Sequence, residues 1–123
     1  MKPQENLMPY LEKYVDYVII VEGKKDSLSL QSLGFQKVFT LHENSVPLKE
    51  RLEIIANNTK KNDRLCILTD FDKKGKQLYL KTKAILSDMP VHLDSSLRSV
   101  LLKAQISHIE GLSTFVLNRE ENF

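Results

Sequence analysis

The sequence predicts an α/β fold with a mainly parallel sheet of about four strands and helices on both faces. Short apolar runs alternate with helical segments four times along the chain, an order typical of parallel sheets with helical crossovers. The runs at 17–21 and 64–69 are continuous rather than alternating, which indicates strands buried on both faces. A length of 123 residues, with 41% hydrophobic and 28% charged residues, fits one domain at 1–123 with its own core.

The amino-terminal half is predicted to hold three helices and two strands. Pro9 fits the first helix only in its opening turn, and Pro47 suits the opening turn of the third. Gly34 is placed to end the second helix, because a glycine readily adopts the backbone conformation found there. The predicted elements are a helix at 5–14, a strand at 17–21, a helix at 26–33, a strand at 37–41 and a helix at 47–57.

The carboxyl-terminal half repeats this alternation after a turn at Asn62-Asp63. Pro90 stops the longest predicted helix. Ser107 and Glu110 have the spacing of a capping box and predict a last short helix through about residue 117. The predicted elements are a strand at 64–69, a helix at 74–89, a strand at 91–93 and helices at 97–103 and from 107 onward.

Composition excludes several classes of site. Cys66 is the only cysteine and lies in a predicted strand, which rules out an intramolecular disulfide and a cysteine-cluster zinc site. The three histidines are isolated in the sequence and leave little scope for a histidine-based metal site. No apolar run approaches a membrane span, and the polar segment 1–14 has no signal-peptide character. The simplest expected location is a reducing cytoplasm.

Acidic residues follow two of the predicted strands. Glu22 ends the first, and Asp70 and Asp72 end the third, with Phe71 pointing the opposite way in an extended segment. Two carboxylates on one side repel each other unless a divalent cation or a shared proton compensates, and oxygen donors suit Mg²⁺ or Mn²⁺. Glu22 would face the aspartates only if the first and third strands are neighbours, as in the order 2-1-3-4. The aspartates are equally placed to cap the next helix, and Glu22 could be a solvated loop acid.

Both acidic segments resemble the motifs of one family. Residues 18–26 (VIIVEGKKD) resemble the first motif of the Toprim domain, and residues 68–75 (LTDFDKKG) resemble its second. Toprim is a Rossmann-like catalytic domain shared by topoisomerases, bacterial primases, recombination-repair proteins, overcoming-lysogenization-type nucleases and a ribosomal-RNA maturation nuclease. The resemblance spans about 17–93, so the chain resembles the small stand-alone Toprim proteins.

The resemblance implies a role for each matching residue. Glu22 matches the glutamate thought to act as general acid or base in phosphoryl transfer, and it is also a candidate metal ligand. Asp70 and Asp72 match the aspartates that hold Mg²⁺. Gly23 and Gly75 match glycines that let the backbone approach the site. Some topoisomerases carry a further acid where this sequence has Lys76, so a fully occupied two-metal site is in question.

Lysines are concentrated around both motifs. The segment 73–83 holds five lysines and no acid, although the net charge of the chain is only +2. Such a run is commonly a solvated helix face. Beside the carboxylates it is equally suited to bind phosphates. The candidate phosphate-binding residues are Lys24, Lys25, Lys73, Lys74 and Lys76.

These features predict Mg²⁺-dependent chemistry on nucleic-acid phosphodiesters, with RNA preferred by resemblance to the ribosomal-RNA maturation nuclease. Topoisomerase or primase activity is not expected, because 123 residues leave no room for the further domains. One alternative is a non-catalytic nucleic-acid-binding module within a larger complex. Another is a small-molecule phosphohydrolase with Asp70 as the phosphate acceptor, which would leave Glu22 and Gly23 unexplained.

Overall fold

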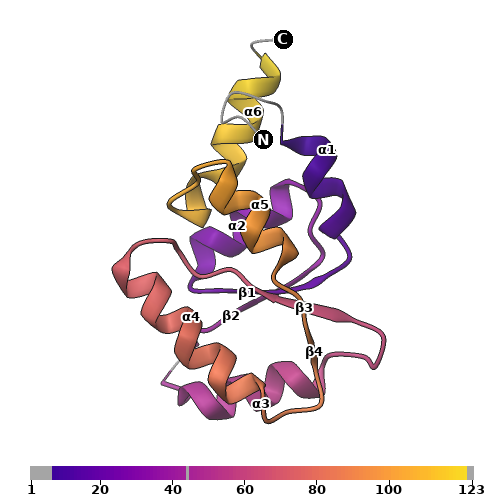
Figure 1. Ribbon diagram of the computed structural model, residues 1–123, viewed down its shortest axis with the longest axis vertical. Coiled ribbons are helices and arrows are strands. Elements are labelled where there is room, and N and C mark those ends of the chain that lie inside the picture. Colours follow the sequence, from indigo (N-terminus) through magenta and orange to yellow (C-terminus); the bar gives the residue numbers. More distant parts are fainter. Residues whose placement is uncertain (1–6, 44, 122–123) are drawn as a thin grey trace.

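The sheet has four parallel strands in the order β2-β1-β3-β4 (Figure 1). A computed structural model describes residues 7–43 and 45–121. The strands are β1 (Val18–Val21), β2 (Lys37–Thr40), β3 (Arg64–Ile67) and β4 (His92–Leu93). Ile20 of β1 pairs with Phe39 on one side and with Ile67 on the other. The predicted α/β class and strand order are confirmed, and the first and third strands are neighbours.

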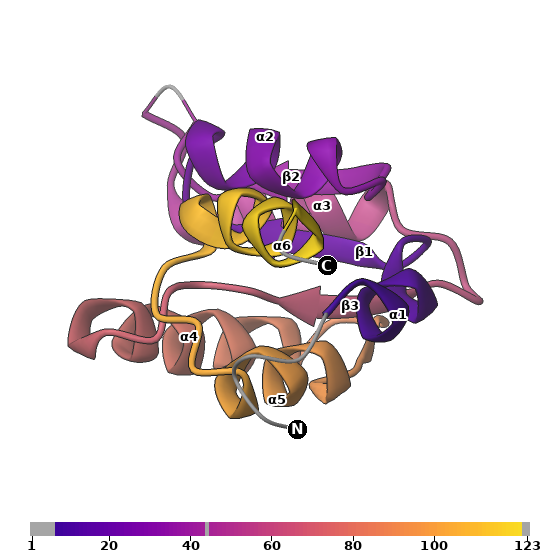
Figure 2. The same ribbon diagram turned by 90° about the horizontal axis from the view of Figure 1, so that it is seen from above.

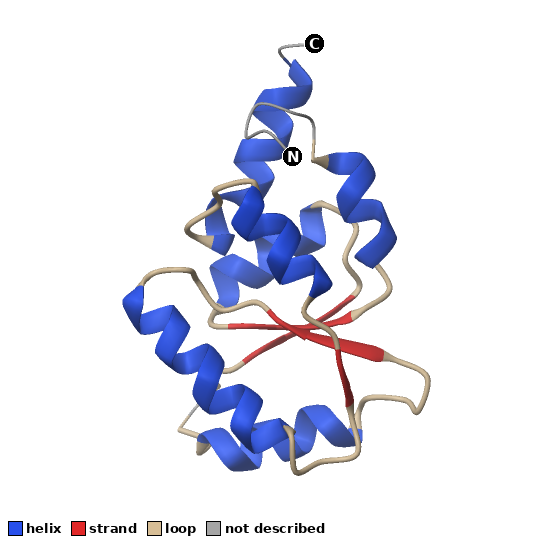
Figure 3. Cartoon of the chain, in the orientation of Figure 1, coloured by secondary structure: helices blue, strands red, loops and turns tan. Residues whose placement is uncertain are grey.

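Helices connect the strands and cover both faces of the sheet (Figure 3). They are α1 (Met8–Leu11), α2 (Lys24–Ser32), α3 (Leu48–Asn57), α4 (Lys73–Leu86), α5 (Ser96–Lys103) and α6 (Leu112–Glu121), with short 3₁₀ turns η1 (Glu12–Tyr14) and η2 (Ile109–Gly111). In Figure 1, α3 and α4 lie on one side of the sheet and α1, α2, α5 and α6 lie on the other. None of the described helices is long and apolar enough to cross a membrane.

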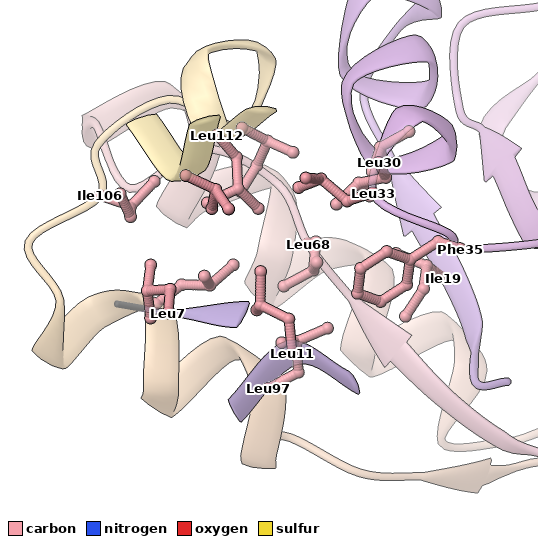
Figure 4. Close-up of a cluster of buried hydrophobic side chains, with 14 of the residues drawn as sticks. Leu7, Leu11, Ile19, Leu30, Leu33, Phe35, Leu68, Leu97, Ile106 and Leu112 are labelled. Carbon is pink, nitrogen blue, oxygen red and sulfur yellow. The ribbon is translucent and has the colours of Figure 1, made fainter. Parts of the chain in front are cut away.

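Two hydrophobic cores lie on opposite faces of the sheet, because alternate residues of each strand point in opposite directions. Ile19 and Cys66 belong to the larger core, which α1, α2, α5 and α6 enclose (Figure 4). Ile20 and Leu65 belong to the smaller core, beneath α3 and α4. The continuous apolar runs in the sequence thus reflect burial of both strand faces. Burial also raises the pKa of the Cys66 thiol to about 12, so this cysteine is a core residue and not a nucleophile.

Some predicted boundaries differ from the structure. The first predicted helix is only one α-helical turn followed by η1, and its residues 5 and 6 lie outside the described part of the chain. The helix α2 begins two residues earlier than predicted, and α4 ends three residues earlier.

The predicted capping box at 107–110 is wrong. The Ser107 hydroxyl lies 3.1 Å from Nδ1 of His108 and caps no helix. The backbone N–H of Ile109, at the start of η2, donates instead to Asp70 Oδ1 at 2.8 Å. A distant carboxylate has taken the place of the local cap.

Candidate functional site

The carboxyl ends of β1 and β3 bring the two acidic motifs into direct contact. Because these strands are neighbours, Glu22 reaches across and accepts a hydrogen bond from the backbone N–H of Asp70 through Oε2, at 2.8 Å. The two residues are 48 positions apart in the sequence. The Glu22 carboxylate therefore lies at the segment that carries both aspartates, as the strand order required.

Each of the three carboxylates is held in place by one backbone N–H. Besides the bond to Glu22, Asp70 Oδ1 accepts from Ile109 N–H at 2.8 Å, and Asp72 Oδ1 accepts from Gly75 N–H at 2.7 Å. Such bonds fix the orientation of a carboxylate. The second oxygen of each group makes no backbone hydrogen bond with the described residues, so it can bind an external ligand.

The two interpretations of the aspartates are therefore compatible. Asp72 is the N-cap of α4, as the capping alternative proposed. Asp70 serves a different segment, since its partner Ile109 belongs to η2. In both residues one carboxylate oxygen accepts a backbone hydrogen bond, and the other oxygen is available to a cation. The capping geometry orients the carboxylates without consuming their capacity to hold a cation.

His108 joins these aspartates and was missed from the sequence. Asp70, Asp72 and His108 each offer one ligand atom, and the three atoms lie within 4.8 Å of one another. His108 Nε2 is 3.6 Å from Asp72 Oδ2. Carboxylate oxygens suit Mg²⁺ and Mn²⁺, and an imidazole nitrogen is better matched to Mn²⁺ than to Mg²⁺. The donor set fits one divalent cation. Glu22 is not part of this group of three, and it lies next to it through its bond to Asp70.

Gly75 is required by a close approach of two backbone segments. An added Cβ at this position would overlap the carbonyl group of Asp70. At Gly23 an added Cβ would meet no atom within 4 Å, and the backbone there is extended. The expected need for glycine therefore has a steric basis in this chain at Gly75 but not at Gly23, where the space beside the backbone is open.

Gly75→Ala is expected to lower the free energy of unfolding by roughly 1–3 kcal/mol, the usual cost of overpacking a tight site. Either the Asp70 backbone or the first turn of α4 must move, which also disturbs the Asp72 cap. Urea denaturation measures the change. Gly23→Ala is the matched control and should cost less, about 1 kcal/mol at most, since Gly23 is the N-cap of α2 and alanine is a poorer N-cap than glycine. Equal effects of the two substitutions would contradict the steric explanation.

The five candidate lysines border the carboxylates from two helices. Lys24 and Lys25 open α2, and Lys73 and Lys74 open α4, followed by Lys76. All five are exposed, and among the described residues none of them forms an ion pair. The amino ends of both helices add partial positive charge. The acidic centre is thus flanked by cations that are free to meet phosphates.

Two buried charged residues form hydrogen bonds to the backbone segments that carry the carboxylates. Asp26 accepts the N–H of Gly23 at 3.0 Å, and burial raises the pKa of its carboxyl, with Asp70 and Glu22 adding to the rise. The guanidinium of Arg98 donates to the carbonyl of Thr69 at 2.7 Å and so holds the end of the β3 segment. Sequence reasoning missed both, although Asp26 lies within the first motif.

The comparisons with known proteins agree with this geometry. A family model described as the Toprim domain matches residues 17–97. A UPF0292 protein of Thermococcus onnurineus is 32% identical over 108 residues, covering 88% of this chain and 77% of the relative. A UPF0292 protein of Methanosarcina barkeri is 29% identical over 119 residues, covering 91% and 79%. A solved structure of a protein from Aquifex aeolicus superposes with a TM-score of 0.69 at 28% identity, covering 84% of this chain and 92% of that one.

Proposed function

The chain belongs to the Toprim domain family, and we propose that it carries out Mg²⁺- or Mn²⁺-dependent phosphodiester chemistry on nucleic acid, with RNA as the preferred substrate. Family membership indicates a metal-dependent function related to nucleic acid. The observation that supports the specific proposal is the direct bond between Glu22 and Asp70, since it unites the proposed proton-transfer group with the proposed metal ligands.

In this proposal the metal is held by Asp70 and Asp72, with His108 as a third donor. A divalent cation held there would neutralise the charge that develops on the phosphoryl oxygens. Glu22 then moves a proton to or from the attacking or leaving oxygen, which is the usual task of a positioned carboxylate. The backbone bond from Asp70 holds one Glu22 oxygen in place and leaves the other for this task.

The lysines are assigned to the phosphates that flank the reacting one. Those of α2 follow Glu22 closely in the chain, and those of α4 lie in the first turn after Asp72. Contacts of this kind position a nucleic acid without reading its sequence. The proposal therefore includes no sequence specificity from these five residues.

Replacement of Lys73, Lys74 and Lys76 by glutamine is expected to weaken binding to all nucleic-acid sequences alike. The slope of log affinity against log salt should fall by up to about 0.9 for each lost phosphate contact on a duplex, or about 0.7 on a single strand. Fluorescence anisotropy over a salt series measures it. Lys60→Gln with Lys61→Gln is the control, since both residues are exposed and lie just before the amino end of β3, whereas the carboxylates lie beyond its carboxyl end. An unchanged slope in the triple variant would mean that these lysines form only a solvated helix face and do not contact phosphates.

Incubation with end-labelled RNA and DNA in Mg²⁺ or Mn²⁺ tests the proposed activity. Metal-dependent cleavage supports it, and cleavage of RNA over DNA supports the substrate preference. Metal-dependent retention of the nucleic acid without cleavage would favour the binding module in a larger complex. Phosphate release from small esters, with nucleic acid untouched, would favour the phosphohydrolase and overturn the proposal.

A further inference from the structure

A groove of about 440 Å³ lies between α4 and α5, next to the segment that carries the metal-binding candidates. The two helices cover opposite faces of the sheet (Figure 1), and Figure 2 shows both of them beside β3, on the side away from α2. Phe71, the residue between Asp70 and Asp72, forms one wall, and Tyr79, Leu80 and Leu102 form others. The groove therefore adjoins the candidate catalytic centre.

The walls of this groove carry several large apolar side chains that are exposed to solvent. Leu80 of α4 and Leu102 of α5 are 64% and 56% exposed, although a polar residue would fit either exposed helix position. The walls also carry the aromatic residues Phe71 and Tyr79. Exposed apolar side chains gathered around a hollow mark a binding surface.

The charge of the groove favours an anionic occupant. Its lining contains two cations, Lys76 and Arg98, and no acid. Four other hollows of the described chain each include a carboxylate, from Glu43, Asp94 or Glu110. An occupant with flat apolar faces and a negative charge matches this combination, and a nucleotide has both.

Arg98 contacts both aromatic walls of the groove. Its guanidinium lies 4.5 Å from the centre of the Phe71 ring and 4.2 Å from that of Tyr79, so it is held between the two aromatic walls. The same group is buried and donates to the Thr69 carbonyl. Cation–π contacts of a desolvated guanidinium stabilise such an arrangement. The walls are thus anchored, through the Thr69 carbonyl, to the segment that joins β3 to Asp70.

We propose that this groove binds the base of an unpaired nucleotide adjoining the phosphodiester at the metal-binding centre. This inference rests on the proposed function and defines its substrate class more narrowly. Base faces are covered by their neighbours in a duplex and become available to apolar walls only in an unpaired nucleotide. Ser95 and Ser99, which also line the groove, offer hydroxyls to the polar edge of a base. The groove therefore selects single-stranded segments, loops or overhangs.

The test compares Leu80→Ala with Leu102→Ala, singly and together, on a labelled single-stranded RNA and on a blunt duplex of the same sequence, without added metal. The double variant is expected to raise the Kd for the single strand about tenfold, within the range known for lost base contacts, and to leave the Kd for the duplex unchanged. Leu28→Ala is the matched control, because this leucine of α2 is 54% exposed and outside the groove; it should stay within twofold. Circular dichroism and Mn²⁺ titration verify the fold and the metal site.

The outcomes separate the two proposals. If the wild type binds both RNAs and the double variant binds them unchanged, the groove is not a base site and the proposed function stands. An equal loss on single strand and duplex would also overturn the inference. If the wild type binds neither RNA, with or without Mn²⁺, the proposed function on RNA fails and this inference with it. Capture of an acidic amphipathic peptide that Leu102→Ala abolishes, with RNA binding unaffected, would make the groove a protein-docking surface instead.

Discussion

Replacement of both Asp70 and Asp72 by asparagine is expected to abolish binding of Mg²⁺ and Mn²⁺ and, with it, any metal-dependent cleavage. The two carboxylates supply the formal negative charge among the three candidate ligands, and His108 alone offers a single nitrogen atom. An amide oxygen is a much weaker partner for a hard divalent cation than a carboxylate. Isothermal titration calorimetry measures the loss directly. Unchanged metal affinity in the double variant would refute the metal assignment.

The same double variant is expected to fold normally, which separates metal loss from unfolding. An asparagine side-chain oxygen can still accept the N–H of Ile109 at position 70 and that of Gly75 at position 72. Asparagine is also as good an N-cap as aspartate. The repulsion between the carboxylates disappears as well. Asp72→Ala is the contrasting variant, since loss of the cap of α4 costs about 0.5–2 kcal/mol of stability.

The strand order could be predicted because the pattern of apolar runs and the positions of the acidic residues indicated the same arrangement. The apolar runs placed the strands, and the acids at two strand ends made sense together only if β1 and β3 were neighbours. The pairing of Ile20 with Ile67 and the bond from Asp70 to Glu22 meet that condition. Where local pattern and site chemistry required the same arrangement, the sequence was sufficient.

The third candidate ligand, His108, could not be predicted because its position depends on tertiary contacts. His108 lies 36 residues after Asp72 and reaches it only because the chain after α5 folds back across the end of β3. That return is fixed by two bonds, from Phe71 N–H to the Ser107 carbonyl at 2.9 Å and from Ile109 N–H to Asp70. No periodicity in the sequence encodes either bond. The capping box at 107–110 was predicted wrongly for the same reason, because the local Ser–Glu spacing does not reveal that the Ile109 N–H donates to the distant Asp70 carboxylate.

Arg98 was missed for a related reason. A lone arginine on a short amphipathic helix is usually solvated, and its position next to Leu97 in the sequence gives no sign of burial. Its burial costs desolvation, which lowers the pKa of the guanidinium. Carbonyl acceptors at the end of β3 and two aromatic rings offset that cost. Only the packing of α5 against β3 reveals this compensation.

Glu22→Gln is expected to reduce nucleic-acid cleavage by about 10²–10⁴, the usual contribution of a positioned acid or base. Glutamine has the size of glutamate but cannot exchange a proton at neutral pH. Its side-chain oxygen can still accept the N–H of Asp70, so the segment carrying the aspartates keeps its position. Metal and nucleic-acid affinities should therefore stay within a few-fold of the wild type. Single-turnover cleavage and Mn²⁺ titration measure the two effects separately.

Glu22→Ala distinguishes proton transfer from positioning. It removes both the exchangeable proton and the acceptor for Asp70 N–H, so it should weaken metal binding as well as cleavage. If Glu22→Gln loses metal as severely as the aspartate variants, Glu22 is a metal ligand, and the division of roles with Asp70 and Asp72 is wrong. If Glu22→Gln cleaves as fast as the wild type while Glu22→Ala does not, Glu22 only holds the Asp70 segment. Proton transfer must then belong to another group or to metal-bound water.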